Sequence, residues 1–263
     1  MISVTSAQLS AWLGLFIWPF VRILALFSTD PIFGNRAVPF RIKMGLALLI
    51  TLIVAPTLDP MPTMDPGSPA GLLILMQQVI IGIAMGLAMR IAFVAVEMAG
   101  HLIGLQMGLG FATVFDPAHS AQVPVVAQFL GIFAVLVFFA INGHLIIVTA
   151  LVDSFRVLPV GASSLSPDAW KTLVLWGAEI FRVGLWLSLP VVSALLITNI
   201  AIGIMTRAAP QLNIFAVGFP LTLMVGFALL YLFIPMLMPL LEQVLHSGVA
   251  AAIHVLQNAR PLP

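Results

Sequence analysis

Six long apolar blocks leave few folds open to this chain. They lie at about residues 9–27, 44–56, 70–96, 123–152, 172–206 and 212–241. A helix needs about 20 apolar residues to cross about 30 Å of hydrocarbon, and lipid accepts only helices or closed barrels because it offers no partners for exposed backbone groups. The blocks lack the apolar and polar alternation of barrel strands. We therefore predict an all-α membrane protein that folds as a single domain over residues 1–263.

Composition supports the membrane assignment and excludes several kinds of chemistry. Hydrophobic residues make up 62% of the chain and charged residues 7%, against about 25% charged residues in an average soluble domain. There is no cysteine, which excludes disulfides, thiolate metal ligands and cysteine nucleophiles. The histidines show no metal-ligand spacing, and Lys and Arg form no basic stripe. The sequence therefore predicts no metal, no cofactor and no nucleic-acid partner.

Catalytic and nucleotide-binding motifs are also missing. The stretch "GLGFAT" (108–113) approaches a dinucleotide-binding motif, but Thr113 stands in place of the last glycine and no strand precedes it. Neither a nucleophile elbow nor a P-loop occurs. We therefore do not expect an enzyme.

Several blocks differ from simple spans and indicate long, kinked helices. The third block can continue as helix through Met107, over about 38 residues or about 57 Å. Pro190 falls inside the fifth block, which is either a kinked helix or a helical hairpin. Two prolines and two glycines occur around the start of the sixth block: Pro210, Gly218, Pro220 and Gly226. We expect a broken or re-entrant helix there, followed by a weakly amphipathic helical tail at about 242–263.

Charged side chains inside apolar blocks are costly in a membrane and are therefore candidates for function. The buried-charge candidates are Arg22, Arg90, Glu97, Glu179 and Arg182. Glu179 and Arg182 stand three residues apart on one helix face and can pair locally. Arg22 lies near the end of a block, from which a long side chain can reach the interface. These acids are too few for a proton or ion relay.

Small residues at four-residue spacing predict close helix packing. Gly82 and Gly86 form one pair, and Gly100, Gly104 and Gly108 form a series. A second helix can approach the backbone closely at these positions. The spacing alone does not decide between a helix of the same chain and a helix of a partner subunit.

Three motifs resemble a known family of export proteins. They are "GNRAVPFRIKMGLALLIT" (34–51), "EMAGHLIGLQMGLGFATVFDP" (97–117) and "APQLNIFAVGFPLTLMVG" (209–226). In this order, and with "INGHL" (141–145) and the opening "SVTSAQLSAWLGLFIWPFVRILAL" (3–26), they resemble the FliR/SctT family of type III secretion export-gate subunits, and its flagellar FliR branch in particular. The resemblance covers essentially the whole chain.

The resemblance implies a noncatalytic subunit of a hetero-oligomeric export gate in the bacterial inner membrane, at the flagellar basal body. Members of this family are built from helical hairpins and assemble with FliP and FliQ into a channel for unfolded flagellar proteins. The implied partners are therefore FliP-like and FliQ-like membrane subunits, FlhB- and FlhA-like export components, the exported chains and the lipid membrane. Hydropathy would then overstate the number of true spans.

The resemblance also implies that the segment between the third and fourth blocks, in a loop at about 106–122, plugs the pore. Glycines loosen its backbone, and soft apolar side chains can seal a constriction against ions. The plug residues are Gln106, Met107, Gly108, Leu109, Gly110, Phe111, Val114, Phe115, Asp116 and Pro117. The Asp-Pro pair is expected to end the helix. The alternative is an ordinary glycine-rich loop packed between helices.

Two other functions stay open from the residues alone. A secondary transporter or ion-coupled carrier would explain broken helices and buried charges, but it needs acids at mid-membrane, for which Glu97 and Glu179 are the candidates. A membrane scaffold without a pore would leave the 106–117 segment indifferent to substitution.

Overall fold

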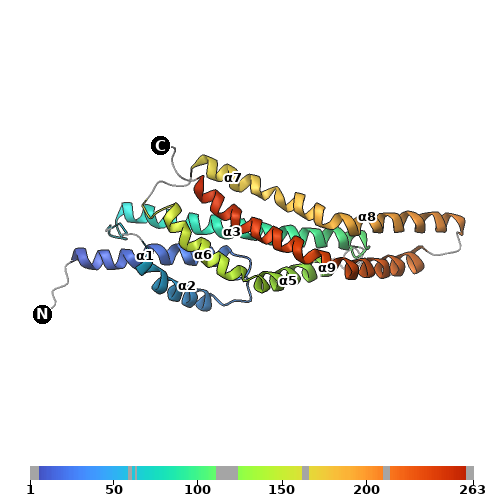
Figure 1. Ribbon diagram of the computed structural model, residues 1–263, viewed down its shortest axis with the longest axis horizontal. Coiled ribbons are helices and arrows are strands. Elements are labelled where there is room, and N and C mark those ends of the chain that lie inside the picture. The colour runs from blue at the N-terminus through green and yellow to red at the C-terminus, as the bar shows by residue number, and fades with distance from the viewer. Residues whose placement is uncertain are drawn as a thin grey trace. The chain divides into compact units, whose positions relative to one another are not determined.

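The computed structural model describes residues 6–58, 61–62, 64–110, 124–161, 166–209 and 214–258. Among these residues the regular structure is helical, with no strand. The helices in chain order are α1 (Ser6–Thr29), α2 (Phe40–Val54), the short 3-10 helix η1 (Ala55–Thr57), α3 (Pro69–Gln106), α5 (Val125–Ala140), α6 (Gly143–Val157), α7 (Pro167–Gly177), α8 (Glu179–Ala208) and α9 (Ile214–Gln257), as Figure 1 shows. The all-α membrane fold is confirmed.

Helices long and apolar enough to span a membrane account for most of the apolar blocks in the described part of the chain. Four stretches of the described chain are long and apolar enough to cross a membrane: Phe40–Thr57, Pro69–Gln106, Pro167–Ala208 and Val217–Gln257. The broken pair α5 and α6 counts as a fifth when taken together. In the first block, the fully described part of α1, Gly14–Thr29, is apolar but shorter than these spans, and the whole helix has 24 residues.

The fourth apolar block consists of two helices. α5 ends at Ala140 and α6 begins at Gly143, and Asn142 between them has a φ of 56°. Asparagine enters this left-handed region more readily than most residues because its short polar side chain can bond locally. The Asn-Gly pair within an apolar run is therefore the sequence signal for this break.

The fifth block is not a hairpin at its proline. α8 runs without interruption from Glu179 to Ala208 through Pro190. Its separation from α7 falls instead at Ala178. A proline removes one backbone donor, and at membrane depth neighbouring groups can satisfy the freed carbonyl.

The expectation of a broken or re-entrant sixth block is wrong for its described part. α9 is one helix of 44 residues that contains Pro220, Pro235 and Pro239, and it continues through the region predicted as a separate tail. Gly218 and Gly226 also lie inside it, whereas Pro210 lies outside the described residues. At Gly226 the reason is packing, because the glycine leaves room for another side chain, as set out below.

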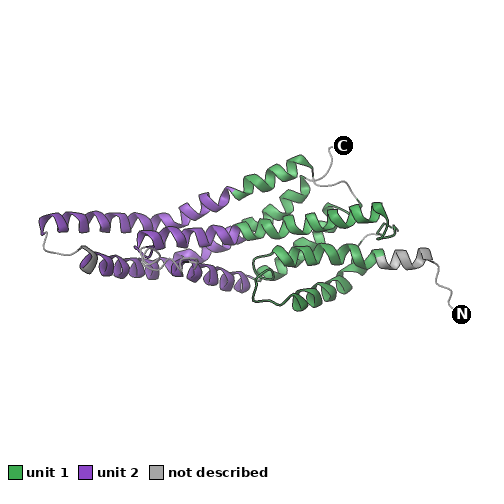
Figure 2. Cartoon of the chain, turned by 180° about the vertical axis from the view of Figure 1, so that it is seen from behind, with its two compact units in different colours: residues 1–91, 142–177, 246–263 green, residues 92–141, 178–245 purple. Residues whose placement is uncertain are grey.

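The chain groups into two compact units, coloured separately in Figure 2. Unit 1 comprises residues 1–91, 142–177 and 246–263, and unit 2 comprises residues 92–141 and 178–245. α3 and α9 each contribute residues to both units. Unit 1 is formed by α1, α2, α6, α7 and the remaining parts of α3 and α9, with Trp18, Phe27 and Leu151 fully buried.

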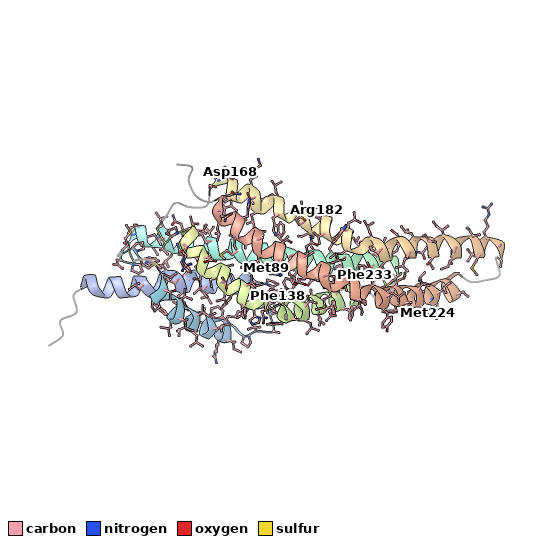
Figure 3. All side chains as sticks on the ribbon, viewed as in Figure 1. Met89, Phe138, Asp168, Arg182, Met224 and Phe233 are labelled. Carbon is pink, nitrogen blue, oxygen red and sulfur yellow. The ribbon has the colours of Figure 1, made fainter. Side chains whose placement is uncertain are left out.

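Unit 2 is formed by α5, α8 and the other parts of α3 and α9. The rings of Phe93 on α3 and Phe138 on α5 pack edge to face, with centroids 5.7 Å apart. Figure 3 labels Phe138 and Phe233, which are buried in this unit, and Met224, which is exposed on α9. The unit therefore has its own apolar core and leaves apolar side chains such as Met224 on its surface.

Candidate functional site

The C-terminus of α3, where the predicted plug begins, has a defined end. Gly108 has a φ of 84°, which suits a residue without Cβ. Its N–H donates to the Leu105 carbonyl at 3.0 Å, and the Leu109 N–H donates to the Gly104 carbonyl at 3.0 Å. This pair of bonds is the Schellman pattern that closes a helix at a left-handed glycine. Gly108 therefore stops α3, and the Asp-Pro pair expected to end a helix lies outside the described residues.

Met107, the residue before this stop, is fixed against α9. Its side chain is fully buried. A Cβ built on Gly226 would lie 2.6 Å from the Met107 Cγ and 2.7 Å from its Cε, so the glycine provides the space that the methionine fills. The Thr222 hydroxyl donates to the Met107 carbonyl at 3.3 Å, but also reaches the Phe219 carbonyl at 2.9 Å. A hydroxyl has one proton to donate, so the steric contact at Gly226 is the stronger restraint.

The other end of the segment borders a cavity beside α9. The first residues of α5, Val125 and Val126, line an apolar cavity of about 220 Å³ with Phe129. The α9 side of this cavity is formed by Phe227, Leu230, Tyr231 and Ile234. Val125 itself is 69% exposed, and the start of α5 is packed on α3 instead, where a Cβ on Gly100 would meet the Ala127 backbone.

The predicted plug residues fall into two groups. The described ones differ in exposure: Met107 is buried, whereas Gln106, Gly108, Leu109 and Gly110 are half-buried. The others lie outside the described residues: Phe111, Val114, Phe115, Asp116 and Pro117. Met107 thus occupies a place in the helix packing, which leaves the later apolar residues of the segment as the candidates for a seal.

The predicted glycine positions pack against helices of the same chain. In unit 1, a Cβ on Gly82 would meet the Arg22 carbonyl and the Ala25 Cβ of α1, and one on Gly86 would meet the Thr29 hydroxyl. In unit 2, a Cβ on Gly100 would meet the backbone of Ala127 on α5, whereas Gly104 makes only ordinary contacts, from 3.8 Å. The space beside Gly82, Gly86 and Gly100 is therefore filled within the chain.

The charged candidates are less buried than their apolar surroundings suggest. Arg90 and Arg182 are exposed on the described chain, and Glu97 and Glu179 are half-buried. Arg182 and Glu179 form an ion pair at 2.6 Å, as their three-residue spacing predicts. Arg90 and Arg182 are therefore not buried within the chain itself, because helical position decides which face of an apolar helix a residue occupies.

Arg22 is the exception, and it lies in the core of unit 1. Its Nε donates to the Gln78 Oε1 at 2.7 Å, one terminal nitrogen to the Ser154 Oγ at 3.1 Å, and the other to the Leu158 carbonyl at 3.0 Å. The guanidinium also stacks on the Phe155 ring, 4.1 Å from its centroid. Neutral acceptors from α3 and the α6 end thus surround a fully buried cation, and no carboxylate is among these partners.

The residues that contact Met107 and Arg22 were not predicted from the sequence. Gly226 was noted in the sequence as a possible helix breaker, whereas in the structure it provides space for the Met107 side chain. Gln78 carried a weaker signal as a polar residue in an apolar block, and nothing marked Ser154 or Leu158. Among the described residues no group of three or more His, Cys, Asp or Glu side chains is placed to hold a metal ion.

Comparison with known proteins places these features in a family. Residues 13–248 match the bacterial export proteins, family 1. The flagellar biosynthetic protein FliR of Pectobacterium carotovorum subsp. carotovorum is 48% identical, and that of Escherichia coli strain K12 is 47% identical, each over 92% of both chains. FliR of Bacillus subtilis strain 168 is 32% identical over 82% of this chain and 84% of its own.

Proposed function

Because the chain belongs to the bacterial export proteins, family 1, we propose that it is a noncatalytic subunit of a gate through which unfolded flagellar proteins cross the inner membrane. It is a membrane-embedded component of the flagellar export apparatus. In the proposal, FliP-like and FliQ-like subunits complete the channel and FlhB- and FlhA-like components stand beside it.

One observation carries the proposal that the 106–117 segment closes this gate. Met107 before the segment is packed on α9 at Gly226, and Ala127 after it is packed on α3 at Gly100. A segment whose two ends are packed on neighbouring helices can be displaced in its middle and return to the same place. This is the mechanical requirement for a reusable seal.

The chemistry of the segment suits the closed state. Its later side chains include Phe111, Val114 and Phe115, and no charge occurs before Asp116. A narrow apolar constriction excludes ions because water leaves it. A passing unfolded chain offers apolar side chains of its own and can replace these contacts, whereas a hydrated ion cannot. The seal therefore opens to a polypeptide and stays closed to ions.

The experiment is to co-express the full chain with FliP-like and FliQ-like partners, purify the complex and measure its ion conductance in planar bilayers. One variant lacks residues 109–115, which keeps the Gly108 stop and the Met107 contact. A second replaces the same residues with Gly and Ser at unchanged length. Both are expected to leak, and a tight Gly-Ser variant would reject the apolar seal. Failure to form any complex would instead reject the proposed partnership.

A further inference from the structure

Asp30 is a buried carboxyl group that uses only one of its two oxygens. It follows the last residue of α1 and is 1% exposed. Oδ1 accepts the N–H groups of Ile32 at 2.9 Å and Phe33 at 3.0 Å. Oδ2 is buried and has no hydrogen-bond partner among the described residues. Buried polar atoms are nearly always paired, so this oxygen requires an explanation.

Asp30 lines a small cavity inside unit 1. The cavity has a volume of about 10 Å³ and is bounded by Met89 of α3, Ile147 of α6 and Val249 of α9 among other residues. Figure 3 labels Met89. Asp30 is the only polar side chain in the lining. The volume is close to the minimum for one water molecule, but a water needs two or more polar partners, and this lining supplies one.

The charged carboxylate is therefore the disfavoured form at this position. Removing a carboxylate from water without a partner for one oxygen costs free energy, which protonation relieves. Burial raises the pKa of the Asp30 carboxyl to about 6, although the N–H bonds from Phe33 and Ile32 oppose the rise. Asp30 lies outside the helices long enough to cross a membrane.

The same residue takes part in the contact between α1 and α3. A Cβ built on Gly86 would meet the Thr29 hydroxyl and would lie 3.0 Å from the Asp30 backbone nitrogen. This contact has no spare room, so hydration of the carboxylate requires the helices to separate slightly. We propose that Asp30 is a proton-binding site of unit 1, and that proton release admits water and loosens the packing of α1 on α3.

No charged side chain among the described residues explains the protonation of Asp30 in another way. The other side chains lining the cavity from α1, α3, α6 and α9 are apolar. The titratable or charged groups nearest in sequence to the lining positions are Arg22 on α1, Arg90 on α3, His144 and Asp153 on α6, and His246 and His254 on α9. None of these is among the groups that shift the Asp30 pKa. The proton itself is therefore the ligand of this site.

The direction of the pH effect follows from linkage. The pKa of Asp30 is higher in the folded chain, about 6, than its ordinary value of 3.8. The stabilisation by proton binding is then complete below pH 3.8 and is lost as pH rises through about 6. Between these values the unfolding constant is expected to rise about tenfold per pH unit, and about 100-fold in total.

The test compares thermal unfolding of the full chain in detergent from pH 4 to pH 7.5 with that of two variants. Asp30→Asn keeps an oxygen for the Ile32 and Phe33 N–H groups but cannot ionise, so the loss of stability through pH 6 should disappear. Asp65→Asn is the matched control, because exposed Asp65 also accepts a backbone N–H, from Gly67 at 2.9 Å. The control should keep the wild-type profile. An unchanged profile in Asp30→Asn would overturn the proposal.

Infrared spectroscopy gives a second readout that does not depend on how Asp30→Asn folds. At pH 5 the wild-type chain should show the carbonyl band of a buried protonated carboxylic acid, which disappears above about pH 7. The Asp65→Asn chain should keep this band and Asp30→Ala should lack it. Absence of the band from the wild-type chain at pH 5 would overturn the proposal, whatever the unfolding profiles show.

Discussion

The side chain of Met107 occupies the space that any side chain at position 226 would need. A Cβ on Gly226 would lie 2.6 Å from the Met107 Cγ and 2.9 Å from its Sδ. The buried residue that directly follows α3 and a glycine in α9 are thus complementary in volume. The packing of Met107 on Gly226 therefore restrains the start of the 106–117 segment more strongly than the Thr222 hydroxyl does. That hydroxyl has one proton for two carbonyl groups.

Enlarging Gly226 should displace Met107 and loosen the start of the segment. Methionine is flexible, so Gly226→Ala should cost about 1 kcal/mol, and the branched Gly226→Val about 1–3 kcal/mol. Thermal unfolding of the full chain measures the cost, and bilayer conductance of the assembled complex should rise in the same order. Gly203→Ala on α8 is the control, because no atom lies within 4 Å of a Cβ there. Equal effects of Gly226→Val and Gly203→Ala would contradict the role given to this contact.

Removing Arg22 should destabilise unit 1, whereas removing Arg90 should not. Arg22→Met leaves the Gln78, Ser154 and Leu158 acceptors buried without their donor. The expected loss is about 2–4 kcal/mol. Arg22→Lys should recover little of it, because an ammonium group lacks the planar fork that reaches three acceptors. The measurement is the thermal midpoint of the purified chain.

Arg90→Met is the matched control for Arg22, because Arg90 also lies in an apolar block but is exposed. It should leave the midpoint nearly unchanged. A loss as large as that of Arg22→Met would contradict the distinction that the structure draws between the two arginines.

The contact between α1 and α3 should not tolerate side chains on its glycines. Gly82→Ala and Gly86→Ala each place a Cβ against the α1 backbone or the Thr29 hydroxyl, and each should cost about 1–3 kcal/mol. Gly45→Ala on α2 meets open space and should be neutral or slightly stabilising, since alanine favours a helix. Unfolding midpoints of the three variants separate the outcomes, and a neutral Gly86→Ala would reject the tight contact.

Arg182 and Arg207 should mark the limits of the part of α8 that lies in lipid. They bracket about 24 residues without a charge, or about 36 Å of helix at 1.5 Å per residue, which matches the bilayer core. The chain has no cysteine, so single cysteines give a clean background. In proteoliposomes, a membrane-impermeant maleimide is given access to both faces of the membrane. It should label Ala178→Cys and Ala208→Cys, and it should not label Ile197→Cys.

Detergent provides the control for this labelling. Ile197 is 69% exposed on the isolated chain, so its cysteine variant should react fully once lipid is removed. Labelling of Ile197→Cys in lipid at the rate seen in detergent would place α8 outside the membrane.

Local patterns in the sequence predicted the helices well where an apolar run was unbroken. α3 has the 38 residues expected of it and ends beside Met107, because hydrophobicity and the Gly108 stop lie in the same stretch of chain. Prolines misled the interpretation of α9, since their cost depends on neighbours that the sequence does not place. The ion pair of Glu179 and Arg182 was predictable because it is local to one helix.

The parts of the site that escaped prediction depend on distant residues. Arg22 finds its partners 56 to 136 positions away, and Met107 contacts a glycine on another helix. Asp30 follows a helix end, where an acid is ordinarily solvated, and only the packing of four helices makes it buried. Contacts of this kind arise only in the tertiary structure. One sequence taken by itself carries no direct record of them.

The Arg22 cluster imposes an order on the biosynthesis of this chain. Ser154 and Leu158 are translated 132 and 136 residues after the cation that they bind. At ordinary elongation rates that interval is on the order of 10 s. During this interval the newly made α1 carries the Arg22 charge without its full set of acceptors. The guanidinium therefore needs contact with water or with a chaperone until α6 emerges from the ribosome.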